Sequence, residues 1–187
     1  DNKLHRTAYA GIEDGIHPNK PCYYARNEIY DSDMTLVSFR SSVGYDTAGP
    51  TVFEANYLHD HSGKQSALQV INGKNIILRD NLLVDVAPMT NTRAIHLGAQ
   101  AVSGQPNSAL EVHILRNTIR AQAKTIFAGI GVSNVDSLFG CRVEDNNVGV
   151  SSIGLTAGIL IRSPYVLPVA TTANVRYARN VAQGVEV

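Results

Sequence analysis

The chain has 187 residues with 16 basic and 16 acidic side chains, so its formal net charge is zero. A balanced charge provides neither the basic field that nucleic acids attract nor an acidic field for a basic partner. A hydrophobic content of 44% excludes a disordered chain. No apolar run approaches the roughly 20 residues that cross a bilayer, and residues 1–20 lack the apolar core of a signal peptide. We therefore expect a folded domain that binds neither nucleic acid nor membrane.

In chain order, six segments repeat one pattern: a short apolar strand, an asparagine, one free residue and an apolar residue. They read CYYARNEI, TVFEANYL, IILRDNLL, VHILRNTI, CRVEDNNV and VRYARNVA, with the asparagine at Asn27, Asn56, Asn81, Asn117, Asn146 and Asn180. Five intervals separate the first asparagine from the last, so the mean repeat is about 31 residues, within the range of repeat proteins. The individual spacings run from 25 to 36 residues, which indicates loops of variable length.

Side chains within each repeat alternate in character around the asparagine. The third residue before it is apolar, as in Tyr24, Phe53, Leu78, Ile114, Val143 and Tyr177. The second residue before it is mixed, as in Ala25, Glu54, Arg79, Leu115, Glu144 and Ala178. Because successive strand residues point to opposite faces, the first set is predicted to point inward and the second mostly outward.

A second strand follows in most units, as TLVSF, ALQVI, AIHLG, AGIGV and AGILI, with an earlier copy in residues 10–16. Units of this kind cannot bury their own apolar face and must stack on their neighbours. The pattern predicts an all-β fold, a right-handed parallel β-helix of about six coils and about 29 Å in height, in one domain over 1–187. The alternative, an antiparallel sandwich, explains neither the columns nor the asparagine. We expect the open ends of such a helix to be covered by a longer chain or by oligomerisation.

The recurring asparagine followed by an apolar residue resembles the N-x-[ILV] turn of the right-handed β-helix family, the pectin-lyase-like superfamily. The resemblance covers the chain from about residue 10 onward. Its members include polysaccharide lyases, glycosidases, epimerases, phage tailspikes and adhesins, so the fold does not name a reaction. The resemblance implies that a polysaccharide lies in a groove along one sheet, between loops such as residues 41–50, 87–93 and 99–109.

Cys22 and Cys141 are each the fifth residue before their asparagine, which the same alternation makes an inward position, and they are four coils or about 19 Å apart. A disulfide requires Cα atoms within about 7 Å. We predict two buried free thiols without a catalytic role.

The motif His59-Asp60-His61 is open to three interpretations: a metal site, an acid/base pair, or a turn. Asp60 is the fourth residue after its asparagine, as are Asp31 and Asp85, and such a row could bind a cation. Aspartate also favours strand-ending turns, where it accepts local N–H groups. The turn is the favoured interpretation, because later repeats carry no acidic residue there.

Histidines and outward polar residues give the remaining candidates. His59 and His61 are expected to face solvent, because a closed metal site needs further ligands. By repeat position, Glu13, Gln69 and His96 are expected to share one exposed sheet face. Glu54 is expected beside Arg79 on the next coil, as a cross-strand ion pair.

Glycosidases use two carboxylates, and lyases use a base with a group that neutralises the uronate. The predicted catalytic residues are Glu13, Glu54, Asp60, His61 and His96, and the predicted substrate-binding residues are Lys64, Arg79 and Arg93. Asp14 is a further acidic candidate. We predict no metal site and no cofactor, with Ca²⁺ a candidate only for a lyase.

Two functions remain open. The first is a lyase or glycosidase that binds and cleaves a polysaccharide. The second is a non-catalytic structural or adhesion module, such as the shaft of a tailspike or a surface protein, because the NTD, DD, GHG, RIK and WIDH motifs of pectin-degrading enzymes are absent. Both predict an extracellular or virion-surface location and a polysaccharide partner. The two functions differ in whether the catalytic candidates converge on one groove.

Overall fold

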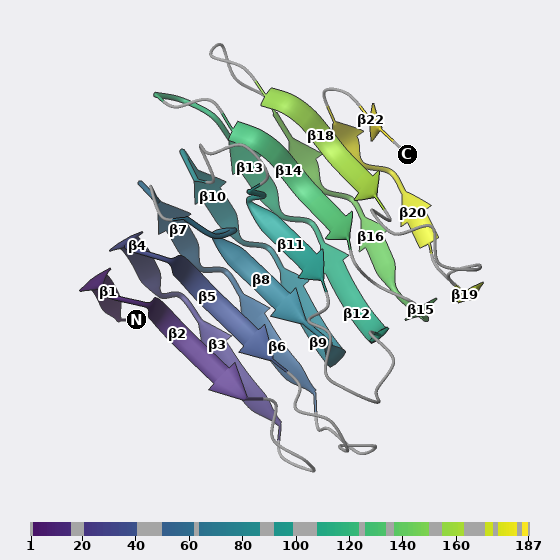
Figure 1. Ribbon diagram of the computed structural model, residues 1–187, viewed down its shortest axis with the longest axis horizontal. Helices are drawn as coiled ribbons and strands as arrows, with labels where there is room; N and C mark the ends of the chain where they lie inside the picture. Colours follow the sequence, from purple (N-terminus) through teal and green to yellow (C-terminus); the bar gives the residue numbers. More distant parts are fainter. Residues whose placement is uncertain are drawn as a thin grey trace.

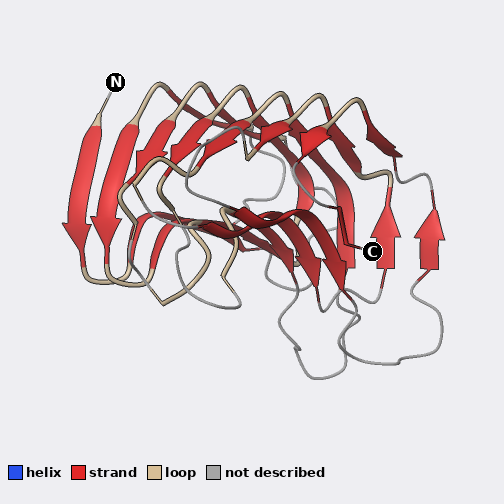
Figure 2. Ribbon diagram, turned by 90° about the horizontal axis from the view of Figure 1, so that it is seen from above, coloured by secondary structure: helices blue, strands red, loops and turns tan. Residues whose placement is uncertain are grey.

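The computed structural model describes residues 2–15, 21–40, 50–61, 64–86, 92–98, 108–123, 126–133, 137–149, 155–162, 171–173, 176–182 and 185–186. Within these ranges the chain contains strands and no helix, and every pairing between strands is parallel. The strands form three sheets whose members recur in rotation along the chain, so the molecule is a β-solenoid of stacked coils. Figure 1 shows the coils succeeding one another from the N-terminal to the C-terminal side, and Figure 2 shows the same stack from above.

Sheet 1 and sheet 2 each contain seven strands in the described part of the chain. Sheet 1 consists of β1 (Lys3–Thr7), β4 (Glu28–Ser32), β7 (Tyr57–His59), β10 (Leu82–Val84), β13 (Thr118–Arg120), β17 (Asn147–Val148) and β21 (Val181–Ala182). Sheet 2 consists of β2 (Ala10–Gly15), β5 (Thr35–Arg40), β8 (Leu68–Ile71), β11 (Ile95–Gly98), β14 (Ile126–Ser133), β18 (Leu155–Arg162) and β22 (Val185–Glu186).

Sheet 3 contains eight described strands, because two of its rows are each divided into two short strands. It consists of β3 (Cys22–Ala25), β6 (Thr51–Glu54), β9 (Lys74–Arg79), β12 (Ser108–Leu115), β15 (Ser137–Phe139), β16 (Arg142–Glu144), β19 (Thr171–Ala173) and β20 (Arg176–Ala178). The parallel order rules out the antiparallel sandwich. The stacked arrangement that the repeat predicted is confirmed.

The corner between sheets 3 and 1 is built by the repeated asparagines. At each corner the residue before the asparagine has a positive φ, from 51° to 57°. That conformation carries the chain from one sheet into the next within two residues. These residues are Arg26, Ala55, Asp80, Arg116, Asp145 and Arg179. Such backbone is uncommon outside glycine, so each corner is held by contacts to its neighbours.

The asparagine side chains supply those contacts as a ladder. Asn56 donates its backbone N–H and its Nδ2 to Oδ1 of Asn81, at 3.0 and 3.1 Å. Asn81 makes the same pair of bonds to Asn117. From Asn56 to Asn146 these side chains are at most 1% exposed. The ladder therefore satisfies polar groups that water does not reach.

The core lies between the three sheets, and the predicted inward columns line it. Phe53, Leu78 and Ile114 succeed one another in register on sheet 3 and are fully buried. The column departs from the prediction at its last member, since Tyr177 is 40% exposed. Cys141 is buried and Cys22 is half-buried, and both are free thiols. The prediction of burial thus holds for Cys141 and only partly for Cys22.

The outward column contains one clear exception. Glu144 occupies the outward position of β16 on sheet 3, yet its side chain is 1% exposed. It is covered because arginines of its own strand and of the next coil pack against its carboxylate.

Candidate functional site

The outer face of sheet 2 carries a continuous row of polar side chains. Strand register places Glu13 of β2 beside Ser38 of β5, Ser38 beside Gln69 of β8, and Gln69 beside His96 of β11. The shared column predicted for Glu13, Gln69 and His96 is therefore correct. The predicted exposure is wrong at Gln69, which is 6% exposed, because neighbouring polar side chains pack over it.

Hydrogen bonds join the first half of this row. Arg40 donates its Nε to Oγ of Ser38 at 3.2 Å, and the same nitrogen lies 3.8 Å from Oε1 of Glu13. Its Nη2 donates to the hydroxyl of Tyr9 at 2.6 Å, and its guanidinium lies 5.9 Å from the centre of that ring. Gln69 donates to Oγ of Ser38 at 3.2 Å. These contacts hold a carboxylate, a guanidinium, a hydroxyl and an aromatic ring in fixed positions relative to one another.

The second half of the row depends on two glycines. A Cβ at Gly98 would lie 2.6 Å from Cε1 of His96, so the imidazole lies directly over that glycine. A Cβ at Gly131 would lie 2.5 Å from Cγ of Arg93, so the arginine stem fills the position next to His96 in the column. Burial and, to a smaller extent, the charge of Arg93 together lower the pKa of His96 to about 4. The imidazole is therefore neutral at neutral pH.

The motif His59-Asp60-His61 lies at the corner between sheets 1 and 2. The prediction that both histidines face solvent is wrong. His61 is fully buried, and its Nε2 donates to the carbonyl oxygen of Gln65 at 3.1 Å. The side chain of His59 is 13% exposed, because it stacks on the rings of Tyr30 and Tyr57. Its ring centre lies 4.7 Å from that of Tyr30 and 4.4 Å from that of Tyr57.

The aspartate row has the geometry of turns. Asp31, Asp60 and Asp85 all have φ between 50° and 55°, a conformation that aspartate adopts more readily than most residues. Asp85 is 6% exposed, and its carboxylate accepts the backbone N–H groups of Gln122 and Ala123. In the described residues, no group of three or more histidine, cysteine, aspartate or glutamate side chains is arranged to hold a metal ion.

The remaining predicted residues lie elsewhere. Glu54 and Arg79 form an ion pair on the outer face of sheet 3, where Glu54 also accepts the hydroxyl of Tyr23. Tyr23 and Arg79, in that order of effect, hold the pKa of Glu54 below its usual value. Lys64 is exposed beyond the corner that follows sheet 1, and its backbone N–H donates to Asp33.

The five predicted catalytic residues thus fall on three separate parts of the solenoid. Sheet 2 holds Glu13 and His96, sheet 3 holds Glu54, and the corner after sheet 1 holds Asp60 and His61. The corner connects to the row through Gln65, whose Oε1 accepts from Gln69 at 3.1 Å. The three loops predicted to border a groove, residues 41–50, 87–93 and 99–109, lie mostly outside the described part of the chain. The residues not described are 41–49, 87–91 and 99–107.

Sequence reasoning did not single out Ser38, Arg40 or Tyr9 as site residues. Ser38 carried a usable signal, because it occupies the repeat position of Gln69 and His96. Arg40 lies two residues further along the same strand, where alternation directs it to the same face. Tyr9 precedes strand β2, where alternation assigns no face, and its ring is placed beside the row by its contact with Arg40.

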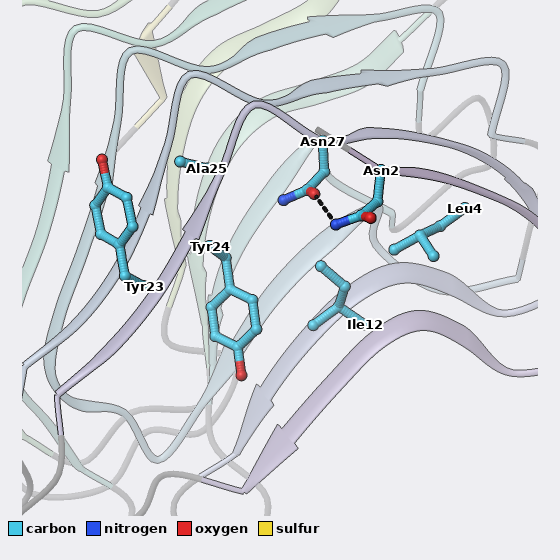
Figure 3. A pocket seen from close by; sticks show the side chains of 7 residues that line it. All are labelled: Asn2, Leu4, Ile12, Tyr23, Tyr24, Ala25 and Asn27. Carbon is cyan, nitrogen blue, oxygen red and sulfur yellow. Dashed lines mark hydrogen bonds between the residues drawn. The ribbon is translucent and has the colours of Figure 1, made fainter.

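A pocket of about 280 Å³ lies on the interior side of the first coil (Figure 3). It is lined by Asn2, Leu4, Ile12, Tyr23, Tyr24, Ala25 and Asn27. The ring of Tyr24 lies on the same side of β3 as Ile12, whereas Tyr23 points to the opposite side. Leu4, Ile12 and Tyr24 also pack against the hydrophobic core, so this hollow is separate from the polar row on sheet 2.

The fold and the row define the class: a parallel β-solenoid with a polar outer face on one sheet. No family model, no curated protein and no solved structure matches this chain. The described part of the chain contains no helix that is long and apolar enough to cross a membrane.

Proposed function

We propose that this chain is a polysaccharide-binding β-helix module whose ligand lies along the polar row on sheet 2. The supporting observation is the continuity of Glu13, Ser38, Gln69 and His96 across four adjacent strands. Strands repeat every 4.8 Å or so, close to the rise of one sugar residue in an extended polymer. Ser38 and Gln69 are buried within the row, so the groups that can meet the hydroxyl groups of successive sugars are the Glu13 carboxylate, the Arg40 guanidinium and the His96 imidazole.

Binding without cleavage is the better supported form of this proposal. Glycoside hydrolysis needs two carboxyl groups within about 10 Å of each other on either side of the bond. Glu13 and Glu54 belong to different sheets, and Asp60 lies at a corner. The alternative weighed from the sequence, a structural or adhesion module at a cell or virion surface, fits this distribution.

We further propose that the solenoid is a right-handed β-helix of about six coils, related to the pectin-lyase-like superfamily. Parallel strands joined by crossovers are nearly always right-handed. The asparagine ladder and the seven described strands in each of two sheets support the coil number. An experimental structure tests both the hand and the count.

Binding is tested by affinity electrophoresis and titration calorimetry against a panel of neutral and acidic polysaccharides. We expect Arg40→Gln to weaken binding about tenfold, because it removes the residue that connects Glu13, Ser38 and Tyr9. The matched control is Arg116→Gln. Arg116 is also a partly exposed, ion-paired arginine, but it lies at the corner before sheet 1.

Equal weakening by Arg40→Gln and Arg116→Gln would locate binding away from the row and contradict the proposal. Retention of binding by both variants would do the same. A folded wild-type chain that binds no member of the panel would refute polysaccharide binding altogether.

A lyase is the second candidate, and one observation favours it. His96 is neutral and lies beside Arg93, which gives a proton acceptor next to a cation able to neutralise a uronate. Ultraviolet absorbance of the unsaturated product reports this reaction, with and without Ca²⁺. Turnover by the wild type that is lost in His96→Gln would replace the binding proposal with a lyase.

A further inference from the structure

A second polar cluster lies on sheet 3, on the neighbouring strands β16 and β20 and the asparagine corners that follow them. Its centre is the buried carboxylate of Glu144. Arg142 donates its Nε to Oε1 at 3.1 Å and its Nη2 to Oε2 at 2.7 Å. Arg176 places its Nε 3.1 Å from Oε1, and Arg179 donates its Nη2 to Oε2 at 3.3 Å. Three guanidinium groups therefore converge on one carboxylate.

The repeat explains why these residues meet. Arg142 and Arg176 are register partners on β16 and β20, so their side chains leave the same face of sheet 3. Arg179 is the residue before Asn180, and Asp145 holds the same corner position one coil earlier. Arg179 accordingly forms a bidentate pair with Asp145, with both N···O distances at 2.6 Å.

The charges in this cluster do not balance. Arg142, Arg176 and Arg179 bring three positive charges, and Glu144 and Asp145 bring two negative charges. The neighbouring pair of Arg116 with Asp80 is balanced one to one. The hydrogen bond from Arg142 holds the pKa of Glu144 below its usual value, and the charges of the other two arginines add to this effect. Glu144 therefore stays ionised and leaves one cation in excess.

The guanidinium groups are also accessible. The side chain of Arg176 is 59% exposed and that of Arg179 is 55% exposed, whereas Glu144 beneath them is 1% exposed. Arg176 reaches Glu144 through Nε, and a guanidinium has four further N–H groups on its two terminal nitrogens. A buried anion that orients exposed guanidinium groups prepares them for a second anion from solvent.

We propose that Arg142, Arg176 and Arg179 form a binding site for an oxyanion, the carboxylate or sulfate group of an acidic polysaccharide. The oxyanion site follows from the cluster alone, and the choice of a polysaccharide rests on the proposed function. A nucleic acid is the less suitable occupant, since the formal net charge of the chain is zero and the excess is confined to this cluster. The site extends recognition from sugar hydroxyl groups on sheet 2 to the charge of the polymer.

The experiment compares polygalacturonate, dextran sulfate and neutral dextran, with binding measured by affinity electrophoresis at constant ionic strength. We expect Arg176→Gln to weaken binding of one or both acidic polymers by about threefold to tenfold and to leave neutral dextran unaffected. The control is Arg6→Gln, because Arg6 is an exposed, ion-paired arginine of the first coil, and this variant should change nothing. The two acidic polymers distinguish a carboxylate from a sulfate ligand.

A second variant separates binding from a purely structural role. Glu144→Gln removes the competing carboxylate and frees guanidinium donors, so acidic polymers should bind more tightly to the folded variant. A cluster that serves only the fold would lose thermal stability in Glu144→Gln without any gain in binding, and that result overturns the proposal. Equal binding by wild type and Arg176→Gln overturns it as well.

Inorganic sulfate serves as a probe that is independent of any polymer. Sulfate stabilises most proteins in a general way, so the relevant quantity is the difference between wild type and Arg176→Gln. A larger rise of the melting temperature in wild type, without binding of any polysaccharide, would keep the anion site and refute both the polysaccharide and the proposed function. A single-stranded DNA that binds as tightly as the acidic polymers would overturn the choice of polysaccharide.

Discussion

Asn117 is bound to Asn146 through a single oxygen: the backbone N–H and Nδ2 of Asn117 both donate to Oδ1 of Asn146, at 2.9 and 3.0 Å. Asn117 in turn accepts the same two bonds from Asn81. Its side chain is fully buried. Each rung therefore depends on the rung of the next coil, and the ladder fixes how one coil sits on another.

Asn117→Ala should strongly destabilise the fold. It leaves two donors of Asn81 without their acceptor and removes the bond from Nδ2 to the carbonyl oxygen of Leu78. Each buried group left unpaired costs about 1–3 kcal/mol, so we expect a loss of about 3 kcal/mol in the free energy of unfolding. Urea unfolding measures it as a lower midpoint with an unchanged slope.

The control for this prediction is Asn2→Ala at the exposed first rung, where one bond of 3.1 Å joins Asn2 to Asn27. That variant should lose less than about 1 kcal/mol. A loss at Asn117 no larger than the loss at Asn2 would show that the ladder does not stabilise the coils.

Asp85 is expected to act as a cap. Asp85→Ala should lower the free energy of unfolding by about 2 kcal/mol, because Gln122 and Ala123 lose the acceptor of their N–H groups. Asp85→Asn keeps an acceptor oxygen and should lose less. Ca²⁺ should not raise the melting temperature of the wild type, and a clear rise that Asp85→Asn abolishes would instead identify the aspartate row as a cation site.

His96 should make stability depend on pH. Its pKa is about 4 in the folded chain against 6.5 as the ordinary value, so the unfolded chain takes up a proton first as the pH falls. Stability from this residue is complete above about pH 6.5 and is lost between pH 6.5 and 4, by at most about 3 kcal/mol. Urea unfolding at both ends of this window measures it.

Because carboxylates titrate near the lower end of the same window, the comparison for His96 is between wild type and His96→Gln. The wild type should lose more stability than the variant on acidification. Identical pH profiles would show that the imidazole is not held in its neutral form by the fold.

The two thiols should differ in reactivity. Cys141 is 1% exposed, whereas Cys22 is half-buried. A disulfide-exchange reagent should label Cys22 first in the folded chain, and both thiols should react at once in denaturant. Faster labelling of Cys141, followed by mass spectrometry of the peptides, would contradict the packing around β16.

The sequence by itself determined the repeated architecture. The spacing of the asparagines and the alternation of side chains around them are local properties, since two-residue periodicity assigns each side chain to a face. They sufficed to predict stacked parallel coils and to place Glu13, Gln69 and His96 in one column.

Only the tertiary structure decided which outward residues are covered. Glu144 is buried by arginines up to 35 residues away in the chain, and His61 is buried at a corner that the alternation of strand residues does not reach. Arg93 lies over Gly131 of the following coil, a contact that depends on the missing side chain of a distant residue. Local periodicity assigns a face, but burial and pKa depend on neighbours that the stacking of coils brings together.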